Sequence, residues 1–444
     1  LHLKVVDTTD ADAIRAIAEA HDLARTCMIV STKSGGTVET LSAFKYFFNR
    51  TLALVGSERV GQHFAGITDP GSKIVELGRR FRFRHVFEND PNIGGRYSAL
   101  SYFGLVPATL VGVDVIKLLE RAIEMSQNAM TGACDTIGNN HAAVLGTLIG
   151  KLALQSHDKL TFLAVPELAS FGDWAEQLIA ESLGKEGKGV LPVVGEPIAP
   201  IETYGPDRLF VHLRLHGHAT FDDLTEALVK TGHPVATIRL DDLYDIGGQF
   251  LLWEMATAIA GHILGINPFD QPNVEAAKVR ARELVAAYMA SGSLPGGQTA
   301  EASPQVLAEF LQPAGPGDYV AIHGYVPPTS ETEVATQALR QAIHLRTGLA
   351  TTFGYGPRFL HSTGQLHKGD GGNGFFIQLV SKANEDVPIP DEAGSETSTM
   401  GFDVLKRAQA LGDSLALQEV SRRVITFDIG TDVAGTIEAL AAKI

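Results

Sequence analysis

Small hydroxyl residues and glycines are concentrated in Ser31–Thr40, with the sequence STKSGGTVET. An apolar β-branched run precedes this segment and a run with helical spacing follows it, so the pattern predicts a turn from a strand into a helix. Such a turn can bind phosphate, because the N–H groups at a helix N-terminus converge and glycine lets the backbone approach the anion. An ordinary capped turn is the alternative, and the spacing does not fit a Walker loop. The candidate phosphate-binding residues are Thr32, Lys33, Ser34, Gly35, Gly36 and Thr37.

A second candidate is Arg96, which follows paired glycines in Pro91–Ser98, with the sequence PNIGGRYS. Paired glycines allow a tight backbone fold, and this fold can hold the guanidinium against negative charge that develops during a reaction. A glycine turn that carries a surface arginine is the alternative interpretation.

A third candidate is Glu181, which begins the glycine- and lysine-rich segment ESLGKEGKG. Glutamate is a residue type that can act as a general acid or base. A solvated helix end is the alternative interpretation.

A fourth candidate is Lys278, the last residue of the segment NPFDQPNVEAAK. The alternative here is a helix that begins at Pro272, has Glu275 in its first turn and carries Lys278 on its surface.

Composition excludes several classes of function. The chain has 444 residues and a net charge of −15, which argues against nucleic acid and anionic membranes as partners. The two cysteines, Cys27 and Cys134, form no disulfide or zinc pattern, so we expect a reducing, cytoplasmic location. No apolar run of about 18 residues predicts a membrane span. No clustered His, Cys and Asp pattern indicates a metal, so we expect no metal or cofactor.

Strand and helix patterns alternate along the chain and predict an α/β fold with parallel sheets. Two doubly wound domains are expected at residues 1–140 and 141–289, followed by a linker at 290–304 and a third α/β unit at 305–444. Residues 2–7, 74–77 and 85–89 are expected to be extended. Because the chain begins at Leu1 in a strand-like run, we expect it to be a fragment that lost upstream sequence.

The four segments resemble, in order, motifs of one family. STKSGGTVET resembles the phosphosugar-binding loop of sugar isomerase (SIS) domains, and more narrowly the SK-[ST]-x-x-T-x-E-T segment of glucose-6-phosphate isomerases. GGRYS resembles the first signature of these isomerases, ESLGKEGKG resembles their GESEGKxxKG segment, and FDQPNVEAAK is similar to their second signature. That signature has Gly or Ala where this chain has Asn273, and we expect Asn to tolerate the left-handed conformation there. The matches imply SIS-like domains between about residues 20 and 280.

A further motif, LHSTGQ at residues 360–365, is similar to the LHSMGQ segment of the short isomerases. In those isomerases the segment follows the catalytic glutamate, whereas here it follows the lysine signature. His361 is therefore the candidate imidazole, and a loop cap is the alternative. The third unit resembles the C-terminal part of bifunctional transaldolase/glucose-6-phosphate isomerases, which implies an upstream transaldolase domain in the parent protein. The family's GxGGSS-type segment would be expected just upstream of residue 1.

These resemblances imply the interconversion of glucose 6-phosphate and fructose 6-phosphate by acid/base proton transfer through an enediolate. The reaction belongs to glycolysis, gluconeogenesis and the pentose phosphate pathway, needs no cofactor, and in this family is carried out by homodimers. The implied roles are phosphate binding by Thr32–Thr37, enediolate stabilisation by Arg96, proton transfer by Glu181, ring opening by Lys278 and His361, and substrate binding by Gly95 and Gln271. A non-catalytic SIS-type phosphosugar-binding module is the alternative, as is an isomerase of mannose or glucosamine phosphates.

Overall fold

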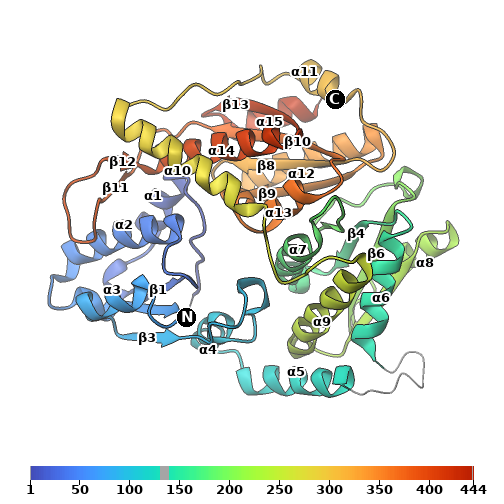
Figure 1. Ribbon diagram of the computed structural model, residues 1–444, viewed down its shortest axis with the longest axis horizontal. Coiled ribbons are helices and arrows are strands. Elements are labelled where there is room, and N and C mark those ends of the chain that lie inside the picture. Colours follow the sequence, from blue (N-terminus) through green and yellow to red (C-terminus); the bar gives the residue numbers. More distant parts are fainter. Residues whose placement is uncertain (1, 131–139, 443) are drawn as a thin grey trace. The chain divides into compact units, whose positions relative to one another are not determined.

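The computed structural model describes residues 2–130, 140–442 and 444 (Figure 1). Its internal contacts divide the chain into two compact units, and both units are discontinuous in sequence. Unit 1 comprises Leu1–Val115, Arg282–Pro295 and Lys382–Ala408. Unit 2 comprises Ile116–Ala281, Gly296–Ser381 and Gln409–Ile444. Cys134 lies outside the described residues.

Unit 1 is built around a parallel sheet with the strand order β1-β2-β3. The strands are β1 (Met28–Ser31), β2 (Phe64–Thr68) and β3 (His85–Glu88). The helices are α1 (Ala11–Ala20), α2 (Val38–Val55), α3 (Lys73–Phe81) and α4 (Tyr102–Leu110), and a short antiparallel pair is formed by β11 (Pro388–Ile389) and β12 (Met400–Gly401). The core is aromatic, because Phe44 and Phe48 of α2 pack against Phe64 of β2.

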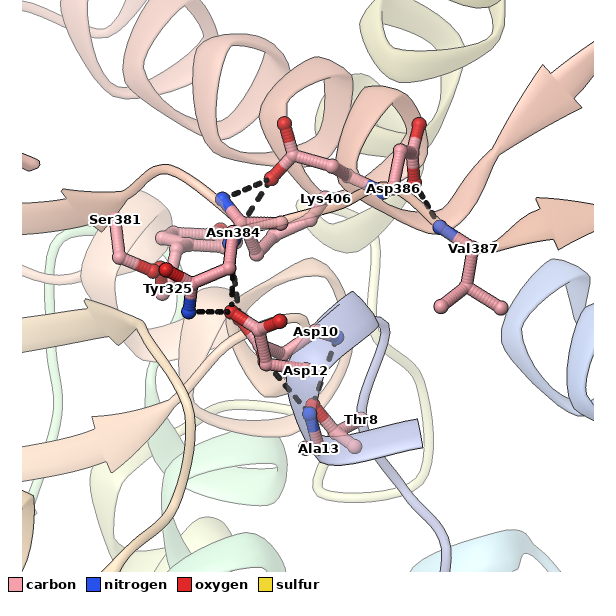
Figure 2. Close-up of polar contacts among 12 residues, drawn as sticks. Thr8, Asp10, Asp12, Ala13, Tyr325, Ser381, Asn384, Asp386, Val387 and Lys406 are labelled. Atoms are coloured by element: carbon pink, nitrogen blue, oxygen red, sulfur yellow. Dashed lines mark hydrogen bonds and ion pairs between the residues drawn. The ribbon is translucent and has the colours of Figure 1, made fainter. Parts of the chain in front are cut away.

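Residues far apart in the sequence meet in unit 1 (Figure 2). Asp10 caps α1 by accepting a hydrogen bond from Ala13 N at 3.0 Å, and it also pairs with the buried ammonium of Lys406 at 2.9 Å. Asp12 accepts a bond from the backbone N–H of Asn384 at 3.1 Å. The segment from Lys382 to Ala408 is therefore an integral part of the unit that contains the N-terminal sheet.

Unit 2 contains two parallel four-stranded sheets. One has the order β5-β4-β6-β7 and consists of β5 (Leu191–Val193), β4 (Lys159–Ala164), β6 (Arg208–Leu215) and β7 (Val235–Leu240). The other has the order β13-β10-β8-β9 and consists of β13 (Arg423–Gly430), β10 (Gly374–Ser381), β8 (Tyr319–Tyr325) and β9 (Ala350–Tyr355). Their central strands are buried on both faces, as parallel strands covered by helices are.

Helices connect these strands. Between residues 115 and 291 of the sequence, the helices are α5 (Val115–Met130), α6 (His141–Ala153), α7 (Ala169–Leu183), α8 (Asp222–Lys230), α9 (Ile246–Leu264) and α10 (Val274–Ser291). The remaining helices are α11 (Pro304–Leu311), α12 (Ser330–Thr347), α13 (Ser362–Gly369), α14 (Phe402–Glu419) and α15 (Val433–Ala441). Helices α10 and α14 contribute residues to both units.

The predicted α/β class with parallel sheets is confirmed. Two local predictions are wrong. Residues 2–7 form no strand, because no described strand lies beside them and their side chains are largely exposed. Residues 74–77 lie in α3, where Ile74 and Val75 are buried on one face of an amphipathic helix. The prediction failed because so short an apolar run fits a strand and a helix equally well.

Each of the three predicted parts of the chain contains its own sheet, but the compact units cut across those boundaries. The boundaries near residues 140, 290 and 305 stay a prediction. Within the described part of the chain, no helix combines the length and the apolar character needed to cross a bilayer.

Candidate functional site

The predicted phosphate loop is the turn between β1 and α2 in unit 1. Thr32 is buried, its N–H donates to Ile67 O of the neighbouring strand, and its hydroxyl lies 2.9 Å from the hydroxyl of Thr37. Gly35 has φ +72°, and a Cβ there would lie 2.8 Å from the backbone nitrogen of Lys73. Thr37 is the N-cap of α2 but makes no side-chain bond to its first turn. The Thr37 side chain therefore does not cap the first turn of α2, which suits an anion site at a helix N-terminus.

Lys33 connects this loop to the predicted Arg96 segment. Its ammonium is 2.5 Å from Asp69 Oδ2 and 2.8 Å from the carbonyl oxygen of Pro91. These contacts hold the Lys33 side chain between the loop and the Arg96 segment, and its part in phosphate binding stays a prediction. Gly95, Arg96 and Tyr97 form one turn of 3-10 helix, in which Arg96 is buried and lies over the Tyr97 ring at 5.2 Å. Two predicted motifs of unit 1 are thus in direct contact.

In unit 2, Glu181 lies in the last turn of α7 and is half-buried. Gln177, one turn earlier, donates to Glu181 Oε2 at 3.4 Å. The segment that follows joins α7 to the lysine motif, because the buried ammonium of Lys185 donates to Asn267 O at 2.7 Å and to Asp270 Oδ1 at 2.8 Å. The predicted glutamate and lysine motifs are therefore held together by a buried cation.

Gln365 joins the LHSTGQ motif to the glutamate and lysine motifs of unit 2. Its Nε2 donates to Gly184 O at 2.8 Å and to Asn273 Oδ1 at 2.7 Å, and its Oε1 accepts from Asn273 N at 2.7 Å. Gly184 ends α7 and Asn273 immediately precedes α10. One buried amide thus links the elements that carry Glu181, Lys278 and His361.

Asn273 has a role that differs from the expected one. It is absent from the residues with positive φ, so no left-handed turn is needed at this position. Its side chain instead accepts the bond from Gln365. Asn273, the residue that differs from the family signature, is therefore hydrogen-bonded to the LHSTGQ segment.

Lys278 and His361 lie on elements that pack together. Ala277, next to Lys278, belongs to the same buried apolar cluster as Phe359 and Leu360, which precede His361. His361 is half-buried and precedes α13, which packs against α7. Gln271 is exposed between Asp270 and Pro272. Among the described residues, the Lys278 ammonium makes no hydrogen bond or ion pair. Lys278 is therefore available to bind or to donate a proton.

A second carboxylate on α7, Glu176, is buried without a direct hydrogen bond among the described residues. Burial raises its pKa from 4.5 to about 7, and the positive charge of Arg358 offsets part of this effect. The folded state therefore favours the protonated carboxyl. The stability that it contributes is fully present below pH 4.5 and is lost as the pH rises through about 7.

Glu176→Gln is expected to raise the free energy of unfolding at pH 8 by up to about 3 kcal/mol, and to leave it nearly unchanged at pH 4. Urea unfolding at both pH values measures the difference. The exposed Glu186, in the same unit, provides the control as Glu186→Gln, for which no pH-dependent gain is expected. Equal gains for Glu176→Gln at pH 4 and pH 8 would contradict the prediction.

The sequence interpretation missed two connecting residues, Lys185 and Gln365. Both stand inside motifs that were already singled out, ESLGKEGKG and LHSTGQ. The signal was their membership of these motifs, but nothing local shows that their side chains point to segments 82 and 92 positions away.

Comparison with known proteins agrees with this arrangement. Residues 1–194 match the family model described as "Phosphoglucose isomerase". A "Probable glucose-6-phosphate isomerase" of Methanococcus maripaludis is 33% identical over 314 residues, which cover 63% of this chain and 70% of the relative. A "Glucose-6-phosphate isomerase" of Rubrobacter xylanophilus is 29% identical over 317 residues, covering 62% and 72%.

Two crystal structures share the fold. A glucose-6-phosphate isomerase of Chlamydia trachomatis superposes with a TM-score of 0.53 at 21% identity, covering 64% of each chain. A hypothetical protein of Thermus thermophilus gives a TM-score of 0.55 at 24% identity, covering 63% of this chain and 76% of its own. The fold, the motif contacts and the matched sequences together define an isomerase enzyme. The chain belongs to the phosphoglucose isomerase family.

Proposed function

We propose that this chain catalyses the reversible isomerisation of glucose 6-phosphate and fructose 6-phosphate. The observation that carries the proposal is the Gln365 amide, whose three bonds connect the end of α7, the start of α10 and the LHSTGQ segment. A phosphosugar-binding module needs only the phosphate loop. Ring opening and proton transfer between carbons require acids and bases, and the elements joined by Gln365 carry a glutamate, a lysine and a histidine.

The chemistry assigns each group one task. Lys278 and His361 transfer the protons that open the sugar ring. Glu181 takes the proton from C2 of the aldose and returns it to C1, and the reverse reaction uses the same carboxylate. Arg96 stabilises the negative charge of the enediolate, a contribution of about 3 kcal/mol for one well-placed donor. The Thr32–Thr37 loop anchors the phosphate, and Gly95 and Gln271 contact the sugar.

A coupled assay tests the proposal. Glucose 6-phosphate formed from fructose 6-phosphate is oxidised by a dehydrogenase, and the appearance of NADPH is followed. We expect turnover of fructose 6-phosphate. With fructose, which lacks the anchor, we expect none, and here the product glucose is measured directly with glucose oxidase. Mannose 6-phosphate and glucosamine 6-phosphate, assayed in parallel, separate the alternative isomerases. A pure, folded chain that converts none of these phosphates would contradict the proposal.

Ser34→Ala is expected to raise KM for fructose 6-phosphate about tenfold, with kcat within twofold, because a hydrogen bond to a charged group contributes about 1.5–3 kcal/mol. Ser34 is exposed in the loop before α2, and Ser57 is exposed just beyond the end of the same helix. Ser57→Ala is therefore the matched control and is expected to leave KM unchanged. An unchanged KM in both variants would remove Ser34 from the phosphate site.

We further propose that the parent protein carries an upstream transaldolase domain, that the chain is a homodimer, and that it works in the cytoplasm. The resemblance of residues 355–370 to bifunctional proteins supports the first point. The mass and transaldolase activity of the native gene product test the fusion. Light scattering after size-exclusion chromatography tests the dimer, and a monomer at micromolar concentration would contradict it.

A further inference from the structure

A buried ion pair in unit 2 contacts the LHSTGQ segment. The ammonium of Lys368 is 2.7 Å from Asp413 Oδ1, and both side chains are buried. Asp413 Oδ2 also lies 3.1 Å from His323 Nδ1 and accepts from Gln378 Nε2 at 3.1 Å. Burial by itself raises the pKa of Asp413, but Lys368 and His323 outweigh burial and hold it well below its usual range. Asp413 is therefore an ionised carboxylate in the interior.

Lys368 uses its remaining donors on the backbone around His361. Its ammonium lies 3.3 Å from Phe359 O and 3.5 Å from Gly364 O. These carbonyls lie two residues before and three residues after His361. The approach at Gly364 is tight, because a Cβ there would be 1.7 Å from Phe359 O. The cation thus holds together the two sides of the turn that carries the imidazole.

Phe359, which lies two residues before His361, is also held in place. The His323 ring stacks on Phe359 at 3.7 Å, with an angle of 7° between the ring planes. Burial lowers the pKa of His323, so the ring is neutral and can stack while Nδ1 donates to Asp413. Asp413 therefore binds both the His323 ring that stacks on Phe359 and the Lys368 ammonium.

We infer that Lys368 and Asp413 are positioning residues that hold the His361 turn in its catalytic geometry. The inference rests on the proposed function, because it gives His361 the ring-opening role. A buried ion pair is seldom the most stable solution, since apolar residues of similar volume often stabilise the fold more. The pair has a geometric use here, because an ammonium donates in several directions at once and Asp413 compensates its charge.

The experiment uses Lys368→Met in the full chain. Lys406→Met is the matched control, because Lys406 is equally buried and pairs with Asp10 at 2.9 Å in unit 1. We expect both variants to melt at a lower temperature. Only Lys368→Met should lose kcat, by at least tenfold with KM within twofold. Exchange between the α and β anomers of glucose 6-phosphate, followed by NMR, reports ring opening alone and should fall in parallel.

Hydrogen exchange of the amides at residues 359–366 decides the positioning role without reference to activity. It should rise at least tenfold in Lys368→Met and stay unchanged in Lys406→Met. If the wild-type chain is inactive, the proposed function fails, while the exchange data still support or overturn the positioning role. If Lys368→Met does not fold, Lys368→Met with Asp413→Leu removes both charges and is measured instead. A folded variant with wild-type kcat and wild-type exchange at 359–366 overturns the inference.

Discussion

Glu181→Gln is expected to lower kcat for fructose 6-phosphate by about 10²–10⁴-fold, the usual contribution of a positioned acid or base. Gln has the same shape but cannot take a proton from carbon. The change lies in the last turn of α7, where Glu181 is only half-buried, so the melting temperature should hardly move. The coupled assay measures kcat, and KM should stay within about threefold because the phosphate anchor is intact.

Glu186→Gln is the matched control for this prediction, since Glu186 is an exposed glutamate five positions further along the same segment. Its kcat should equal that of the wild type. If Glu181→Gln turned over at the wild-type rate, the base would have to be another group, and the assignment of Glu181 would be wrong.

Gln365→Leu is expected to have the second largest effect. It leaves Asn273 N, Asn273 Oδ1 and Gly184 O without their partner, at a cost of about 1–3 kcal/mol for each group that stays buried. The elements that carry Glu181 and Lys278 then lose one of their links, while the bonds of Lys185 to Asn267 and Asp270 remain. Because a misplacement of about 1 Å can cost about 10²-fold in rate, we expect kcat to fall by about that factor.

Gln249→Leu provides the control. Gln249 is a buried glutamine of α9 in the same unit, and its Oε1 has no partner among the described residues. Its replacement removes no known bond, so kcat should stay within twofold. Kinetics and urea unfolding of both variants separate the two cases. A Gln365→Leu enzyme with unchanged kcat would show that the link is not needed for catalysis.

Short-range patterns were enough to predict much of this molecule. The strand, glycine turn and helix around Ser31–Thr40 appear as β1, the loop and α2. The parallel α/β class followed from alternating strand and helix signals, and family membership followed from four ordered motifs. These features depend on neighbours within one or two turns of chain, so the sequence contains them directly.

Only the tertiary structure decided which distant groups meet. Lys406 reaches Asp10 across 396 positions, and Gln365 reaches Gly184 across 181. Lys33 binds Asp69, 36 positions away. Such contacts arise from packing of whole elements, and no local periodicity encodes their partners. Candidate residues for the chemistry could therefore be named from the sequence, whereas the buried bonds around them required the fold.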